Sequence, residues 1–568
     1  MPVGLSLGGL RRSFVTRPQS ELTAVLAAIA IAAVVQAQDG RVGIAPGGSS
    51  IHEQELKADL SFLASDLLQG RLTGTAGNEL ATEFIRARFE RLGLKPMGPD
   101  DSYFQPYMLM TAALGARNTL EIQGVGRELR PKVREDFYPH QFSASTNAHG
   151  PLVFAGFGIV APQRGYDDYR GADVDGRVVL VLDHEPGERD PASPLDALVS
   201  ADAATPLRKT LAAQERGAAA ILFVRDVHNH GSAASYPLSA GASGVWPQTP
   251  TRIQQYMLAA WGDRVHIPAV EISPDVASIL LRATGKSLNE IARESESTSG
   301  RTPVPIPSVR IDVSTAVTRT LVPDRNVVAA VEGGDPQVRN EWVILGAHLD
   351  HDGADGTQIF NGADDNGSGT VALLEIAEAY AEAARGGQRP RRSVLFASWN
   401  SEERGLLGSW AYTEQPLVPL ERTVAVINMD MVGRNEEIPS NGGNRFEGLP
   451  PQSAQSNENA VNVLGYSYAP ELTEEVVRAN APFGLDVKQR YDNNGATLLS
   501  RSDQWPFLVR GIPAIWFFGG LHPDYHTPAD RPEKINYPKL ARIARLMHQT
   551  SWLLAQRDRR PKLSRPAV

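Results

Sequence analysis

Four apolar segments in the C-terminal half of the chain each end in side chains that can bind a metal ion or move a proton. They span 342–347, 393–399, 423–428 and 513–518. The side chains that follow them are, in chain order, His348 and Asp350, Glu402 and Glu403, Asp430, and Tyr525 and His526. Near-continuous apolar runs are typical of strands covered on both faces of a parallel sheet, and the carboxyl ends of such strands meet at one edge. We therefore expect these side chains to lie close together.

Imidazole and carboxylate groups in one cluster are typical of sites for zinc and related divalent cations. Two neighbouring ions need one carboxylate that bridges them. Asp365 is placed for this role, because the glycine-rich loop 361–369 lets the backbone approach closely before a helix begins. The remaining ligands form two sets, each with a position left for water, and the sets are His348 with Asp430 and Glu403 with His526.

Two acidic residues beside these ligands are expected to act without binding metal. Glu402 is adjacent to Glu403, and neighbours in a loop can point in different directions, so Glu402 stays free to act as a general base. Asp350 can hold the imidazole of His348 in a fixed orientation. The chain contains no cysteine, so thiolate metal sites, disulfides and thiol catalysis are excluded.

Length and charge limit the class of protein further. The chain has 568 residues, is 42% hydrophobic and carries a formal charge of −9. This length is typical of two or three domains with sizeable cores. The acidic balance argues against a protein that binds nucleic acid.

The N-terminus is similar to an export signal. Arg11 and Arg12 precede an apolar segment, 22–35, which leads to small residues ending at Ala37. This is the order of the n-region, h-region and cleavage site in such signals, and the paired arginines are similar to a twin-arginine signal. We expect residues 1–37 to be removed and the mature protein to be periplasmic or secreted, with no stable membrane span. A single N-terminal membrane anchor is the alternative.

Helix-like and strand-like patterns alternate along the rest of the chain. Apolar residues at helical spacing predict helices over 53–67, 76–92, 368–384, 471–479 and 537–554. With the apolar segments and a further strand candidate at 326–331, they predict an α/β fold, in which helices flank a mixed, largely parallel sheet. The segment 150–295 is richer in strand patterns, and residues 290–308 are interpreted as the linker that leaves it.

Several other polar residues have less specific surroundings. His228 and His230 lie in a polar loop, and we interpret them as solvated side chains rather than metal ligands. Arg71 lies in a glycine-rich turn and is either a surface charge or a contact on the substrate side. Asp364 is interpreted as a loop or helix-start residue, and Asp503 as a residue near the site or one that supports it.

The sequence is similar to the co-catalytic di-zinc exopeptidases (metallopeptidase family 28), which include bacterial leucyl aminopeptidases and glutamate carboxypeptidase. The resemblance is strong over 309–554 and weaker over 53–96. It rests on motifs in the family's order, which are His348-x-Asp350, Gly362 to Gly369, Asn400 to Gly408, Asn428 to Gly433 and Tyr525 to Asp530. Residues 150–295 resemble the protease-associated domain often inserted in this family.

The resemblance implies a domain division and a role for each site residue. After the export signal expected at 1–37, it implies parts of a peptidase domain at 38–140 and 301–560, and an inserted protease-associated domain at 141–300. Two Zn²⁺ ions per chain would be held by His348 and Asp430, by Glu403 and His526, and by the bridging Asp365. Glu402 would be the general base and acid. Tyr525 resembles a residue that polarises the substrate carbonyl in some relatives.

The resemblance favours an exported aminopeptidase that acts on peptides. A carboxypeptidase or dipeptidase on the same fold is the main alternative, because such enzymes hold a terminal carboxylate with basic residues, and Arg404, Arg434 and Arg501 are candidates. A non-catalytic binding protein is the alternative from another class, and the complete ligand set argues against it.

Overall fold

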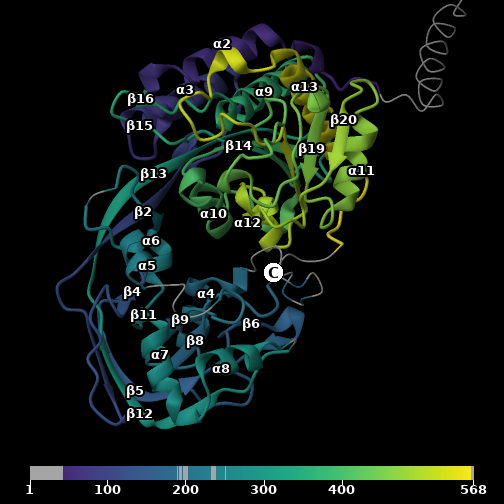
Figure 1. Cartoon of the computed structure of the whole chain (residues 1–568). Coiled ribbons are helices and arrows are strands. Elements are labelled where there is room, and N and C mark those ends of the chain that lie inside the picture. Colours follow the sequence, from purple (N-terminus) through teal and green to yellow (C-terminus); the bar gives the residue numbers. More distant parts are fainter. Residues whose placement is uncertain are drawn as a thin grey trace, which may run out of the picture. The chain divides into compact units, whose positions relative to one another are not determined.

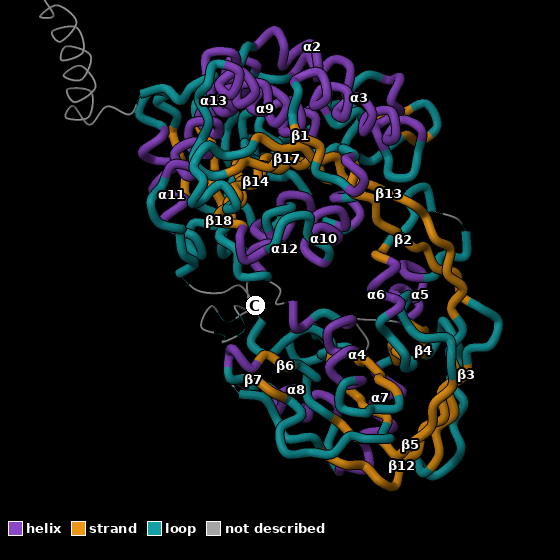
Figure 2. The backbone as a smooth tube through the Cα atoms, turned by 180° about the vertical axis from the view of Figure 1, so that it is seen from behind, coloured by secondary structure: helices purple, strands orange, loops and turns teal. Residues whose placement is uncertain are grey.

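The central strands of the structure are the four whose ends carry the candidate site residues. They are β14 (Trp342–His348), β17 (Ser393–Trp399), β18 (Thr423–Asp430) and β21 (Ala514–Phe518). They lie side by side in the order β17-β14-β18-β21, and every neighbouring pair is parallel. Figure 2 shows β17, β14 and β18 next to one another. Their carboxyl ends therefore point to the same edge, as the sequence predicted.

The structure is a computed structural model, and it describes residues 43–188, 190, 193, 195, 202–231, 238–249, 251–297 and 299–564. The export signal predicted at 1–37 lies outside the described residues and stays a prediction. Within the described ranges, no helix combines the length and the apolar character needed to cross a bilayer.

Both faces of the central strands are buried, because side chains alternate between two apolar cores. Val343 and Leu345 of β14 pack into one core, whereas Ile344 between them packs into the other. The helices of the first core are α2 (Glu53–Leu63), α3 (Ala76–Leu92), α9 (Gly369–Arg385), α11 (Pro470–Ala479) and α13 (Tyr537–Gln556) (Figure 1). Those of the second are the shorter α10 (Leu407–Glu414) and α12 (Trp505–Val509). The apolar runs of the sequence thus form strands covered on both sides.

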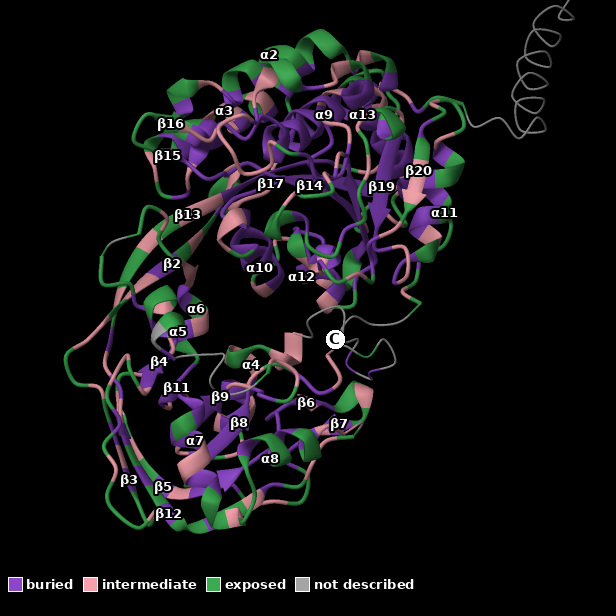
Figure 3. Ribbon diagram, viewed as in Figure 1, coloured by how far each residue is buried: buried purple, intermediate pink, exposed green. Residues whose placement is uncertain are grey.

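The described strands of this sheet number ten. Antiparallel neighbours extend the parallel centre on both sides, so the sheet is mixed, and the α/β prediction is confirmed. The added strands are β1 (Lys95–Pro96), β2 (Phe104–Leu114), β10 (Met257–Leu258), β13 (Val317–Val331), β19 (Ala460–Leu464) and β20 (Asp486–Gln489). Figure 3 shows that β14, β17 and β19 are buried along most of their length.

The chain between β2 and β13 forms a second sheet. Strands β2 and β13 themselves pair with each other over eleven residues. Seven described strands build the second sheet, in the order β3-β12-β5-β8-β9-β11-β4. They are β3 (Thr119–Gln123), β4 (Phe137–Pro139), β5 (Asn147–Phe154), β8 (Val178–Leu182), β9 (Ala220–Val224), β11 (Ala269–Ile272) and β12 (Val304–Ser314). Strands β5, β8, β9 and β11 are parallel. This second sheet extends on both sides beyond 141–300, and the domain division itself stays a prediction.

The remaining described elements are short. The helices are α4 (Pro206–Gln214), α5 (Leu238–Val245), α6 (Ala259–Asp263), α7 (Pro274–Leu281) and α8 (Leu288–Ser295). The two-residue strands are β6 (Val160–Ala161), β7 (Tyr166–Asp167), β15 (Ala354–Asp355) and β16 (Gln358–Ile359).

The element predictions succeed where the sequence has clear boundaries. The helix predicted at 76–92 is confirmed as α3, since Thr75 accepts a hydrogen bond from the Asn78 amide and Gly93 takes a left-handed conformation. The linker predicted at 290–308 is wrong in part, because α8 and β12 occupy most of it. Ser287 and Glu290 form a capping box at the start of α8, and this signal was overlooked in the sequence.

Candidate metal centre

The ends of β14 and β18 bring the first predicted ligand set together. His348 Nε2 lies 3.3 Å from Asp430 Oδ1 and 3.4 Å from Asp365 Oδ1. All three side chains are buried. Ser502 Oγ donates a hydrogen bond of 2.6 Å to the other oxygen of Asp430. Asp430 is therefore fixed with one oxygen facing the imidazole, and the sequence analysis did not single out the serine that does this.

Asp365 lies between the two predicted sets. Its Oδ1 faces His348, and its Oδ2 lies 2.9 Å from His526 Nε2. The loop is held by Asp530, whose carboxylate accepts hydrogen bonds from the amides of Asp364 and Asp365. The two oxygens of one carboxylate thus point at different imidazoles, which is the arrangement expected of a bridging ligand.

The second set contains a histidine that the sequence analysis missed. Glu403 Oε1 lies 3.3 Å from His526 Nε2, as predicted, but it also lies 2.8 Å from Nδ1 of the buried His351. His526 is oriented by Asp352, whose Oδ2 lies 3.2 Å from Nδ1. His351 and Asp352 directly follow Asp350, so their closeness to the motif was the available signal.

Glu402 lies on the side of the first set. Its Oε2 is 3.7 Å from His348 Nε2, and burial raises the pKa of its carboxyl well above the usual range. Glu402 and Glu403 begin a short turn of 3₁₀ helix after Ser401, which has a left-handed backbone conformation. Because of this turn, the two neighbouring carboxylates face different histidines.

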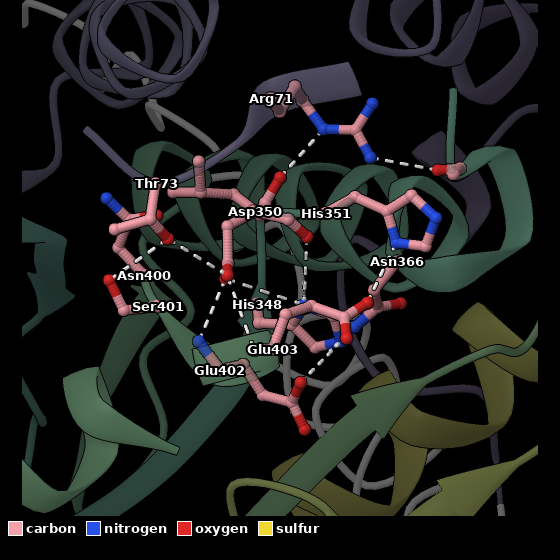
Figure 4. A network of polar contacts seen from close by, with 12 residues as sticks. Arg71, Thr73, His348, Asp350, His351, Asn366, Asn400, Ser401, Glu402 and Glu403 are labelled. Atoms are coloured by element: carbon pink, nitrogen blue, oxygen red, sulfur yellow. Dashed lines mark hydrogen bonds and ion pairs between the residues drawn. The ribbon is translucent and has the colours of Figure 1, made fainter. Parts of the chain in front are cut away.

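Asp350 is placed differently from the expectation. Its carboxylate lies 3.8 Å from His348 Nδ1, whereas its backbone carbonyl lies 3.3 Å from that nitrogen. The carboxylate instead accepts hydrogen bonds from the amides of Glu402, at 2.9 Å, and Glu403, at 3.3 Å (Figure 4). Asp350 therefore ties the end of β14 to the turn that carries both glutamates.

Arg71 is neither a surface charge nor a contact on the substrate side, so both sequence interpretations were wrong. Its side chain is buried, and it donates hydrogen bonds to the carbonyls of Leu349, at 2.7 Å, and of Asn361 and Gly362, at 2.7 and 2.9 Å. A fourth bond, of 2.5 Å, reaches Leu63. The guanidinium joins the loop after β14 to the loop that carries Asp365.

The ligand clusters open into a cavity of about 390 Å³. Tyr525 lines it, with its ring centroid 4.0 Å from that of His526. The apolar lining residues are Leu406, Met431, Leu498, Trp516, Phe518 and Leu521. Arg501 also lines the cavity, whereas Arg404 and Arg434 lie in ion pairs with Asp352 and Asp524. Of the three predicted arginine candidates, Arg501 is therefore the one at the cavity wall.

The other residues of uncertain role support the site from outside. Asp364 lies in the short helical turn Ala363–Ser368 directly before α9, consistent with its interpretation as a loop or helix-start residue, and its Oδ1 accepts a 2.6 Å hydrogen bond from the Gly433 amide. His522 Nε2 lies 3.2 Å from the other oxygen of Asp364. Asp503 is buried and accepts a 2.5 Å hydrogen bond from Ser409 Oγ, and burial raises the pKa of Asp503 to about 7.

The donor set fits a pair of zinc ions. Ligand atoms about 2.0–2.2 Å from a tetrahedral ion lie roughly 3.3 Å from one another. The distances found between histidine nitrogens and carboxylate oxygens are 3.3 and 3.4 Å around His348, and 2.9 and 3.3 Å around His526. The cluster also gathers several buried carboxylates, which need nearby positive charge to be stable as anions. These carboxylates belong to Asp350, Asp365, Glu402, Glu403 and Asp430.

His230 is not simply solvated. It lies beside Glu188 and His184 in the second sheet's segment, where the three form a further group of metal-binding type. His228 is exposed, as interpreted.

Comparison with known proteins finds a family model that matches the part of the chain holding this site. Residues 326–551 match the family model of Peptidase family M28. This segment, 226 of the 568 residues, is similar to peptidase family M28. The family prediction made from the motifs is confirmed, and the M28 segment contains every predicted ligand.

Curated relatives are similar to the M28 segment over part of their length. Aminopeptidase NAALADL1 of Rattus norvegicus is 41% identical over 222 residues, which is 36% of this chain and 27% of the relative. Probable glutamate carboxypeptidase AMP1 of Arabidopsis thaliana is 34% identical over 212 residues, which is 36% of this chain and 26% of the relative. The chain thus matches about a quarter of the length of each.

Solved structures are similar over a larger share of the chain. The aminopeptidase from Aneurinibacillus sp. strain AM-1 aligns with 91% of this chain and 96% of its own, at 17% identity and a TM-score of 0.45.

Proposed function

We propose that the protein is an exported zinc-dependent exopeptidase that removes N-terminal residues from peptides. The observation that supports this most is the position of Asp365, whose two oxygens face His348 and His526. Two ligand sets that share one carboxylate fit a pair of ions rather than a single one. We assign His348 and Asp430 to one zinc, Glu403 and His526 to the other, and Asp365 to both.

When bound, such a pair supplies a water of lowered pKa and a polarised scissile carbonyl. Glu402 is the general base in this proposal. Its Oε2 lies 3.7 Å from His348 Nε2, so its carboxylate is placed beside the ligands to accept a proton from the attacking water and later give it to the leaving amine. Tyr525 lines the same cavity, where its hydroxyl can donate a hydrogen bond to the carbonyl oxygen of the substrate.

The cavity supports an aminopeptidase with a preference for apolar residues. Its lining includes Leu406, Trp516 and Phe518 beside the proposed zinc ligands. A side chain such as that of leucine can bury its apolar surface there.

A carboxypeptidase is the second candidate, and Arg501 favours it. Arg501 and Arg445 line the cavity, and arginine binds a carboxylate through two parallel hydrogen bonds. Arg445 already donates to the carbonyl of Tyr525, so Arg501 is the arginine better placed to hold a terminal carboxylate.

One experiment separates the two candidates. Zinc-loaded protein is incubated with the same leucine-rich peptide in free, N-acetylated and C-amidated forms. The proposal predicts cleavage of the free and C-amidated peptides and none of the N-acetylated one. Cleavage that requires a free carboxylate, and that is lost in Arg501→Ala, would establish the carboxypeptidase instead.

The proposed location has its own test. Cells that express the full chain are separated into cytoplasmic, periplasmic and medium fractions. We expect the processed protein outside the cytoplasm, and Arg11→Lys combined with Arg12→Lys should retain it inside if the signal is of the twin-arginine type.

A further inference from the structure

The second sheet ends two of its parallel strands with residues of metal-binding type. Strands β8 and β9 are neighbours, and Leu182 at the end of β8 pairs in register with Val224 at the end of β9. The loop after β8 carries His184 and Glu188, and the loop after β9 carries His230. This is the placement that brings the ligands together in the M28 segment.

The three side chains face one another closely. His230 Nε2 lies 2.8 Å from Oε1 and 2.9 Å from Oε2 of Glu188, and His184 Nδ1 lies 3.4 Å from Oε2. The two imidazole rings have centroids 4.1 Å apart. One ligand atom from each residue lies within 4.8 Å of the other two. The nitrogen–oxygen distances of 2.8, 2.9 and 3.4 Å are near the roughly 3.3 Å expected between ligand atoms of one tetrahedral zinc ion.

Hydrogen bonds between the two loops hold the histidines in place. Asp183 Oδ1 accepts a 2.6 Å bond from the Asp226 amide, which joins the two strand ends directly. Glu296 joins the loops a second time, because its carboxylate accepts bonds of 2.6 Å from both the Gly187 amide and the Asn229 side chain. The positions of His184 and His230 therefore do not depend on contact between the rings.

A buried cation fixes the backbone at His184. Lys209 is about 1% exposed, and its ammonium donates to the carbonyls of Leu182, at 3.0 Å, and His184, at 2.5 Å. His184 has a left-handed backbone conformation, with φ of 55°, which this contact helps to hold.

The charges around the cluster are compatible with a divalent cation. The guanidinium of Arg225 lies 3.4 Å from Asp183 Oδ2, so its positive charge faces a carboxylate. Asp183 Oδ2 is also 3.4 Å from His184 Nε2, so it can hold the ring nitrogen that faces away from Glu188. A carboxylate on the second nitrogen of a metal-bound imidazole is a common supporting contact.

We propose that His184, Glu188 and His230 bind a zinc ion that joins the loops after β8 and β9. Two imidazoles, one carboxylate and a fourth position for water form a ligand set that zinc uses in proteins. The site lies in another sheet than the peptidase ligands and does not depend on the proposed peptidase activity. Its role is to stabilise the segment between β2 and β13, because the ion would connect two loops that the fold otherwise joins through hydrogen bonds.

The test uses cobalt, whose visible absorption reports tetrahedral binding, in a chain whose peptidase site is disabled by Asp365→Asn. We expect this variant to bind about one Co²⁺ per chain with the intense absorption of a tetrahedral site. Adding His230→Ala or Glu188→Gln to the Asp365→Asn chain should abolish both the tetrahedral absorption and the binding of this Co²⁺ ion. Adding His228→Ala, a matched control from the same loop, should leave both unchanged.

A second measurement guards against variants that fail to fold. Far-ultraviolet circular dichroism should be the same for His230→Ala and His228→Ala, and zinc should raise the melting temperature of the segment in the His228→Ala chain alone. Absence of this Co²⁺ ion in the Asp365→Asn chain would overturn the proposal, and so would equal binding in the His230→Ala and His228→Ala chains. Loss of peptidase activity would not affect this outcome, since the cobalt signal is read without substrate.

Discussion

The two sheets of this protein place metal-binding residues by the same device but with different amounts of surrounding structure. In the M28 segment, four parallel strands end in ligands or their neighbours, and Asp365 joins two sets. In the second sheet, two parallel strands contribute three residues. In the proposed assignments, the paired site draws on four strand ends, whereas the single site draws on two.

Both regions also use a buried cation to hold the loops that carry the ligands. Arg71 donates to three carbonyls of the M28 segment and to that of Leu63, and Lys209 donates to the carbonyls of Leu182 and His184. Arginine has five donors in a rigid plane, so it can join several loops at once, whereas the ammonium of lysine holds fewer groups. The candidate site for two ions is therefore held by arginine, which makes more hydrogen bonds than the lysine beside His184.

The largest expected effect is that of Asp365→Asn, which should change the M28 segment and leave the second sheet unaffected. Asp365→Asn removes the shared charge, and we expect peptidase activity to fall by at least ~10³-fold with loss of zinc from the M28 segment. Zinc bound by His184, Glu188 and His230 should remain. Metal analysis of the purified variant checks this, and a variant that keeps the wild-type zinc content would break the assignment of Asp365 as a bridge.

Glu402→Gln should lower turnover by roughly 10²–10⁴-fold without changing the metal content, because it removes a proton acceptor and not a ligand. Steady-state kinetics and zinc analysis on the same preparation measure both quantities. If zinc is lost together with activity, Glu402 is a ligand of the first set, a reading that its 3.7 Å distance from His348 also permits.

Removal of the two buried cations should destabilise different regions by different amounts. Arg71→Met removes the donor of the buried carbonyls of Leu63, Leu349 and Asn361, whereas Gly362 still accepts from the Gly367 amide, and we expect the free energy of unfolding to fall by about 3–5 kcal/mol. Lys209→Met removes the donor of two carbonyls, and about 1–3 kcal/mol should be lost. Hydrogen exchange should show the first effect around β14 and the second around β8, and the exposed Arg422→Met serves as a control.

The smallest expected effect is a pH dependence shared by both regions. Burial lowers the pKa of His140, in the second sheet's segment, to about 4 and that of His548, in α13, to about 3. Both are neutral when folded and have a pKa near 6.5 when unfolded, so the stability they contribute is present above pH 6.5 and is lost as pH falls. Each should cost about 2 kcal/mol between pH 6.5 and 5.

Denaturant unfolding at several pH values measures this loss in wild type. His140→Gln and His548→Gln should each reduce the change in unfolding free energy per pH unit by up to about 1.4 kcal/mol, which corresponds to one bound proton. An unchanged slope in both variants would mean that other groups control acid unfolding.

The sequence predicts the M28 segment well because its signals are local. Each apolar run is followed within a few residues by its ligand, so parallel pairing alone brings His348, Asp430 and His526 together. Arg71 was misread because its partners are backbone carbonyls nearly three hundred residues away. Nothing in its neighbourhood shows that it is buried.

The cluster in the second sheet was missed for a related reason. His230 was interpreted together with His228, which is close to it in sequence. Its partners Glu188 and His184 lie instead on the loop after the neighbouring strand β8. Strand patterns were recognised in the segment 150–295, and His184 closely follows one of its strands, β8. The pairing of β8 with β9 was the missing step, because the sequence does not specify which strands become neighbours.

Diffraction from crystals grown with zinc, recorded at the zinc absorption edge, tests the central claim most directly. The account predicts two anomalous peaks about 3.5–4 Å apart, with Asp365 between them, His348 and Asp430 beside one, and Glu403 and His526 beside the other. A single peak at this place, or none in a crystal that shows zinc elsewhere, would contradict it.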